Sequence, residues 1–168
     1  MYEQLLDEAV ANGLTVIEKY PFESARIRGL CCDDTIAISA QVDTAAERTV
    51  VLCEELTHAL HSYGNILHDG RMERRTQERI FDRLVGLGGL VKASAAGCRE
   101  TWEFAEFFGV PERFFNNVME NYRERYGVMK KIKSGGEEFV LSFEPTFRIR
   151  KLCTTRHKQK MIRKERAV

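Results

Sequence analysis

The chain has 168 residues, of which 43% are hydrophobic, enough for one domain with a real core and a small appended lobe. No apolar run approaches the length that spans a membrane, and residues 1–8 are too acidic for a secretory signal. The five cysteines form neither an even set nor a CxxC pair, which suits a reducing compartment. These features exclude a membrane protein or a disulfide-rich secreted protein, and we expect a cytoplasmic one.

The formal net charge is +1, but it is unevenly distributed along the chain. Residues 148–168 carry nine Lys or Arg against Glu165 alone, a charge of about +8, which leaves about −7 on the preceding residues. A basic tail either contacts nucleic acid or an acidic partner, or serves as a solubilising end. No aromatic residue follows Phe147 to stack on bases, which favours the solubilising end. Nucleic acid is therefore expected as a partner only through this tail.

Residues 1–40 predict a helix and three short strands. Asn12-Gly13 is a helix stop signal, and Asp33-Asp34 is a turn signal between two β-rich segments. The predicted elements are a helix over 2–11 and strands over 14–20, 26–32 and 35–40.

A longer helix follows, capped by Asp43 or Thr44 and broken at Gly64. It contains Glu54-Glu55-Leu56-Thr57-His58, a departure from the HExxH zinc-protease frame in which Glu replaces the first His. Residues four apart on a helix differ by about 40° in direction, so Glu54 and His58 would reach the same metal. Glu55 would act on a metal-bound water as its general base. A solvated acidic helix face is the alternative interpretation of the same frame.

A second helix over 72–84 carries Glu78, and a glutamate on the following helix is how His/Glu zinc sites obtain their third ligand. A surface glutamate among arginines is the alternative. Gly86, Gly88 and Gly89 then predict a hinge between two lobes.

The second half of the chain predicts a small helical lobe. Helices over 102–108 and 112–126 flank a tight turn at Gly109-Val110-Pro111, as in a helix-turn-helix. The later helix is too acidic for phosphate contact, which favours substrate docking or packing over DNA reading. Alternating apolar residues over 139–143 predict a strand that returns to the first sheet. The predicted organisation is a lobe over 1–89, a helical lobe with the returning strand over 90–147, and a basic tail over 148–168.

The sequence also resembles a known family, the ImmA/IrrE metallopeptidases of bacteria, prophages and mobile elements, over about residues 5–147. Members typically carry HExxH, but one branch among phage and Gram-positive proteins has EELxH followed by a KQE-like segment. The resemblance is carried by Glu54-Glu55-Leu56-Thr57-His58, Thr76-Gln77-Glu78, Gly97-Cys98-Arg99 and the run from Trp102 to Val110.

The resemblance implies an α+β fold with a minimal zincin-like lobe, made of a helix, a three-stranded sheet, an active-site helix and a ligand helix. It further implies a metal-dependent endopeptidase that cleaves a helix-turn-helix repressor, the antirepressor of a prophage or mobile element. Glu54, His58 and Glu78 take the ligand positions and Glu55 that of the catalytic base. Zn²⁺ is the expected metal, although two carboxylates beside one histidine also suit Mn²⁺ or Fe²⁺.

His61, three residues after His58, would replace Glu54 as a ligand or donate a hydrogen bond to a ligand, and a partly exposed position at the cleft rim is the alternative. Tyr63 and His61 are also candidate donors to the oxyanion, because they lie near the end of the motif helix. Two other functions remain open. One is a non-catalytic antirepressor on a zincin fold, suggested by the substitution at Glu54. The other is a DNA-binding regulator that uses the helical lobe and the basic tail.

Overall fold

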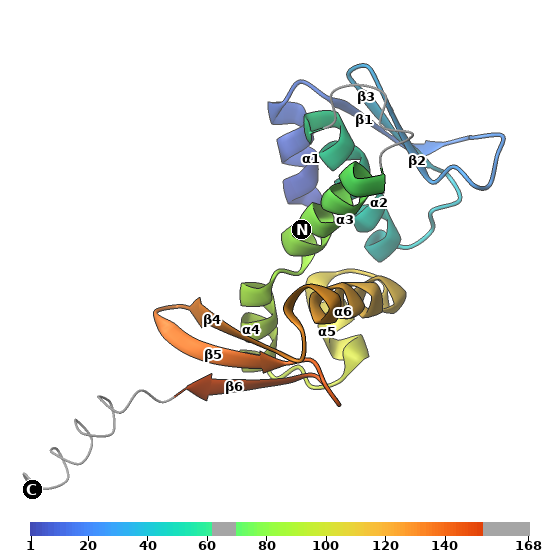
Figure 1. The fold of residues 1–168 in the computed structure, drawn as a ribbon. Helices are drawn as coiled ribbons and strands as arrows, with labels where there is room; N and C mark the ends of the chain where they lie inside the picture. Colours follow the sequence, from blue (N-terminus) through green and yellow to red (C-terminus); the bar gives the residue numbers. More distant parts are fainter. Residues whose placement is uncertain (62–69, 153–168) are drawn as a thin grey trace, which may run out of the picture.

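The computed structural model describes residues 1–61 and 70–152 and shows a mixed α+β fold (Figure 1). Within these residues there are six helices and two three-stranded sheets, one sheet in each half of the chain. Buried side chains from both halves form one hydrophobic cluster. None of the helices in the described ranges is long and apolar enough to cross a membrane.

The first sheet has its strands in the order β1-β3-β2. Strand β1 runs parallel to β3, and β2 pairs with β3 in the antiparallel sense through a turn in which Asp33 has φ +50°. The predicted helix, hairpin turn and three strands are confirmed here. The bounds are α1 (Tyr2–Ala11), β1 (Thr15–Tyr20), β2 (Gly29–Cys32) and β3 (Thr35–Ser39).

Helices α2 (Ala45–His61) and α3 (Gly70–Leu84) complete the first half of the chain. Helix α2 packs against β2, β3, α1 and α3 through a buried stripe that includes Val51, Leu52 and Leu56. Thr44 caps α2, because its Oγ1 accepts a hydrogen bond of 3.1 Å from the Glu47 N–H. The sheet, α1 and α3 therefore surround the helix that carries the Glu54-Glu55 pair.

In the second half, helices α4 and α6 pack against a fully antiparallel sheet of order β4-β5-β6, and α5 packs against α4 and α6. Gly109 has φ +65°, the left-handed conformation that ends α5 before the turn into α6. Stacked rings of Phe104 and Phe115 join α5 to α6. The bounds are α4 (Leu87–Ala95), α5 (Thr101–Phe108), α6 (Glu112–Tyr126), β4 (Met129–Ser134), β5 (Glu137–Ser142) and β6 (Arg148–Leu152).

Three expectations for this half need correction. Of the three glycines predicted to form a hinge, Gly88 and Gly89 lie inside α4, where a Cβ at Gly89 would come 3.0 Å from Cε1 of Phe108, and Gly86, with φ +62°, lies in the connection between α3 and α4. Close packing of the helix against that ring explains the glycine at residue 89. The strand around residues 139–143 does not return to the first sheet but pairs with β4 and β6. Residues 148–152, expected to begin a tail, form β6.

Candidate functional site

The acidic pair Glu54-Glu55 lies at the middle of α2, and both side chains are half-buried. Their neighbours Val50, Val51 and Cys53 are buried, because this helix is covered on more than one side. The interpretation of these glutamates as a solvated helix face is therefore wrong. Two adjacent carboxylates held away from water interact strongly and resist ionisation.

Glu55 lies under the edge strand β2. Its carboxylate accepts a hydrogen bond from the backbone N–H of Cys31, which favours the ionised form. Burial and the negative charge of Glu54 outweigh that contact and raise the pKa of Glu55 to about 7. A carboxyl group with this pKa accepts and releases a proton near neutral pH.

The direction of the Cys31 N–H places Glu55 on the free edge of β2. Arg28 C=O accepts a hydrogen bond from Ser39 N–H of the neighbouring strand. Because backbone groups alternate in direction along an antiparallel strand, the N–H of Cys31 points away from β3. Glu55 thus binds a backbone group on the side of β2 that pairs with no strand in the described chain.

Glu54 faces a hollow of about 490 Å³ between α2, α3 and α6. Burial raises the pKa of Glu54 above its usual range, the positive charge of Arg28 opposes this, and the negative charge of Glu73 adds to it. Val50, Phe81 and Phe114 give the hollow an apolar wall. The carboxylate therefore stands in a partly apolar recess.

Two arginines border the same hollow. Arg28 and Arg113 both pair with Glu47, at 3.3 Å and 2.8 Å respectively. Since one carboxylate is shared by two guanidinium groups, the hollow carries a net positive charge on these side chains beside the Glu54 carboxylate, on which Arg28 acts. Gln77 of α3 and Asn117 of α6 add neutral polar groups to its lining.

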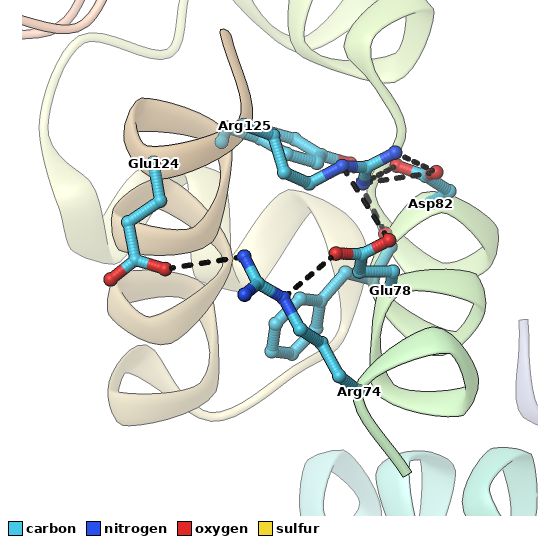
Figure 2. Close-up of polar contacts among 7 residues, drawn as sticks. Arg74, Glu78, Asp82, Glu124 and Arg125 are labelled. Carbon is cyan, nitrogen blue, oxygen red and sulfur yellow. Dashed lines mark hydrogen bonds and ion pairs between the residues drawn. The ribbon is translucent and has the colours of Figure 1, made fainter. Parts of the chain in front are cut away.

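The structure brings His58 and Glu54 to one helix but keeps Glu78 apart from them. His58 is half-buried four residues after Glu54. Glu78 binds the Nε of Arg74 at 3.3 Å and approaches the Nε of Arg125 at 3.9 Å, toward α6 (Figure 2). It belongs to an ion-pair network between α3 and α6, not to the recess beside Glu54.

Both arginines of this network also contact other carboxylates. Arg125 binds both carboxylate oxygens of Asp82 at 3.2 Å, and Arg74 approaches Glu124 at 3.9 Å (Figure 2). Asp82 lies one turn after Glu78 on the same face of α3. Gln77 and Phe81 lie on the adjacent stripe, which faces the hollow.

The described residues show no assembled metal site, and the predicted ligand set is not tested by them. In residues 1–61 and 70–152, no three His, Cys, Asp or Glu side chains converge as ligands for one ion. Glu78 is engaged by arginines, and Glu54 and His58 make a pair of candidate ligands rather than the usual three. Metal binding therefore stays a prediction.

Two further residues, His61 and Tyr63, were predicted to support the site. His61 is exposed at the last residue of α2, and its predicted role stays a prediction. Tyr63 lies outside the described residues. Three residues that line the hollow were not predicted to do so. Gln77 lies one helical turn before Phe81, and this spacing indicates that both face the same side of α3. Arg28 and Arg113 are far apart in sequence and come together only in the tertiary fold.

Comparison with known proteins adds no relative to this picture. No protein-family model, curated protein or solved structure matches the chain. The function must therefore be argued from the acidic pair, the edge strand and the hollow.

Proposed function

We propose that the chain is an endopeptidase that hydrolyses a peptide bond in a regulatory protein, with Glu55 as the general base. The observation that carries this proposal is the half-buried Glu55 carboxylate, with a pKa of about 7, on the free edge of β2. At neutral pH a substantial fraction of this group is ionised and able to take a proton from water.

The position of Glu55 favours an extended peptide as substrate. An edge strand with unpaired backbone groups binds an extended segment by adding it as a further strand. A peptide on β2 would lie beside Glu55, and exposed Leu30 would contact its side chains. The order of a helix, a three-stranded sheet, α2 and α3 is the one expected of a minimal zincin-like lobe, and it supports the same proposal.

Glu54 and His58 would supply two ligands to a divalent metal, Zn²⁺ first and Mn²⁺ or Fe²⁺ as alternatives. The expected substrate is a helix-turn-helix repressor, so the protein would act as an antirepressor of a prophage or mobile element. The proposed metal and the proposed substrate both rest on the resemblance of the motif segments to the ImmA/IrrE family. Elemental analysis of the purified protein and of Glu54→Ala tests the metal directly, since loss of a bound ion in the variant would support Glu54 as a ligand.

Cleavage is tested with a peptide library whose new termini are read by mass spectrometry, in the presence of each metal. We expect Glu55→Gln to lower cleavage by at least about 100-fold, the range of a general base. Glu106→Gln, at an exposed position on α5, is the matched control and should cleave normally. Equal cleavage by Glu55→Gln and the parent would contradict the proposed base.

A second function, stoichiometric binding without catalysis, is favoured by the ion pairs that hold Glu78 away from Glu54. It would use the same edge strand and hollow to bind a regulatory protein. In that case Glu55→Gln would relieve repression as well as the parent chain, and neither would produce cleavage fragments.

A further inference from the structure

The outer face of the second sheet presents positive charge that no element of the described chain covers. Paired residues in an antiparallel sheet point to the same side, so the register assigns each side chain to a face. Lys131, Val140 and Arg150 form one cross-strand row, and Met129, Ser142 and Arg148 form the next. A third row on the same side holds Lys133, Glu138 and Leu152, in which the two charges pair with each other. We call the six residues of the first two rows the outer sheet face.

The opposite face of the sheet is packed. Leu141 is fully buried, and Ile132, Phe139 and Ile149 contact the hydrophobic core. Lys130 lies on this inner side, with its Nζ 4.6 Å from the ring centre of Tyr126 in α6. Helices α4 and α6 pack against β4. On the outer sheet face Met129, Lys131, Arg148 and Arg150 are exposed.

The cations of the outer sheet face lack acidic partners. The carboxylates nearby are already paired: Glu138 with Lys133 at 3.7 Å, Glu137 with Lys151, and Glu144 with Arg123 at 3.7 Å. In the part of the chain that the structure describes, no carboxylate lies within ion-pair distance of Lys131, Arg148 or Arg150. These three charges are therefore available to an external anion.

The outer sheet face contains a hollow, and the sequence that follows β6 is also basic. A hollow of about 200 Å³ lies at this face, and its lining includes Ser142, Arg148, Arg150 and the Glu144 carboxylate, which pairs with Arg123. Beyond β6 the chain continues with six further Lys or Arg and a single Glu. Positive charge on the sheet is thus continuous in sequence with positive charge in residues 153–168.

We propose that the outer sheet face binds the phosphate backbone of double-stranded DNA. Strands β4 and β6 lie on either side of β5, so their cations stand roughly 10 Å apart, on the order of a DNA groove width. DNA interfaces are polar and strongly positive, whereas protein interfaces have an apolar centre with aromatic anchors. The outer sheet face has no aromatic residue, which also disfavours stacking on single strands.

The binding does not depend on peptide hydrolysis, so it is tested separately with the full chain. Anisotropy of a short labelled duplex of arbitrary sequence is measured between about 50 and 200 mM salt. The test variant is Lys131→Gln with Arg150→Gln, which removes two unpaired charges from one cross-strand row. The matched control is Lys133→Gln with Lys151→Gln, which removes two charges already paired with Glu138 and Glu137.

We expect the test variant to weaken binding and to reduce the salt slope of the logarithm of affinity by about 1.8, since each lost phosphate contact contributes about 0.9. The control variant should change the slope by less than half as much. Absence of binding at about 50 mM salt, or equal slopes for the two variants, would overturn the proposal. Poly-glutamate that competes as well as unlabelled duplex at equal charge would replace DNA with an acidic protein as the partner.

Discussion

The carboxylate of Glu55 lies directly against the backbone of Gly29. A Cβ on residue 29 would come 2.9 Å from Oε1 and 2.8 Å from Cγ of Glu55, and 2.6 Å from Cγ1 of Val51. Glycine therefore allows β2 to approach α2 with no side chain between them. This close approach helps to remove Glu55 from water, and burial is the largest cause of its raised pKa.

The first prediction is that Gly29→Ala destabilises the protein and disturbs Glu55. The added methyl group overlaps two side chains, one of them the buried Val51, so the strand must move away from α2. Overpacking of this kind costs about 1–3 kcal/mol of unfolding free energy. Urea denaturation measures the loss, and cleavage assays should show a lower rate because the distance from Glu55 to β2 changes.

Gly88→Ala is the matched control for this substitution. Gly88 lies inside α4, and a Cβ there would come no nearer than 3.9 Å to Ser134 Oγ. Alanine is the better helix former, so we expect this variant to gain about 0.5–1 kcal/mol. A loss at residue 88 as large as that at residue 29 would contradict a specific contact at Gly29.

The second prediction concerns stability and pH. The pKa of Glu55 is about 7 in the folded chain against an ordinary value of 4.5, so between these values the folded state holds a proton that the unfolded state has released. The free energy of unfolding should therefore fall as pH rises from about 4.5 to about 7, by an amount on the order of 2 kcal/mol from this group.

Glu55→Gln removes the titrating group while it keeps the shape of the side chain. We expect its stability advantage over the parent chain to be absent near pH 4.5 and to grow until about pH 7, as measured by urea denaturation at several pH values. A constant difference across this range would show that burial does not raise the pKa of Glu55.

The third prediction separates the two causes that raise the pKa of Glu55. The negative charge of Glu54 is the second of them, so Glu54→Gln should lower the pH midpoint of Glu55 toward its ordinary value. Carboxyl ¹³C NMR of labelled glutamate follows this midpoint directly. Glu73→Gln is the control, because Glu73 acts on Glu54; a shift as large as that from Glu54→Gln would contradict the assignment.

Much of the fold was predictable because local signals agree with tertiary packing. The helices Tyr2–Ala11 and Glu112–Tyr126 have the bounds that their stop and start residues indicate. Strand β4 escaped notice because its inward-facing positions include Lys130, whose charge is accommodated over the ring of Tyr126. A cation that packs by its contact with an aromatic ring hides the apolar alternation that identifies a strand.

The candidate site was predictable on α2 and not beyond it. The frame of Glu54, Glu55 and His58 is local, so helical spacing alone places these residues correctly. Which face of α3 meets α2 depends on the partners of its side chains. Arg125, distant in sequence, pairs with Glu78 and Asp82 and fixes that face toward α6, a relationship that no spacing within α3 reveals.

The last prediction decides the role of Glu78. If the role of Glu78 is to form ion pairs with Arg74 and Arg125, Glu78→Gln and Arg125→Gln should each destabilise the protein. The loss of unfolding free energy in the double variant should then be smaller than the sum of the two single losses. The side chains of Glu78 and Arg125 are about three-quarters buried, with 25% and 21% exposure, so a coupling of about 0.5–1 kcal/mol is expected. Denaturation of the four proteins of the cycle measures it.

The same variants distinguish an ion-pair residue from a metal ligand. A structural Glu78 predicts equal metal content in the parent, Glu78→Gln and Arg125→Gln by elemental analysis. A ligand would instead lose the metal in Glu78→Gln, while Arg125→Gln, which frees the carboxylate from its guanidinium partner, would keep or increase it. Full additivity in the stability cycle together with metal loss confined to Glu78→Gln would therefore contradict the structural role and return Glu78 to the site beside Glu54.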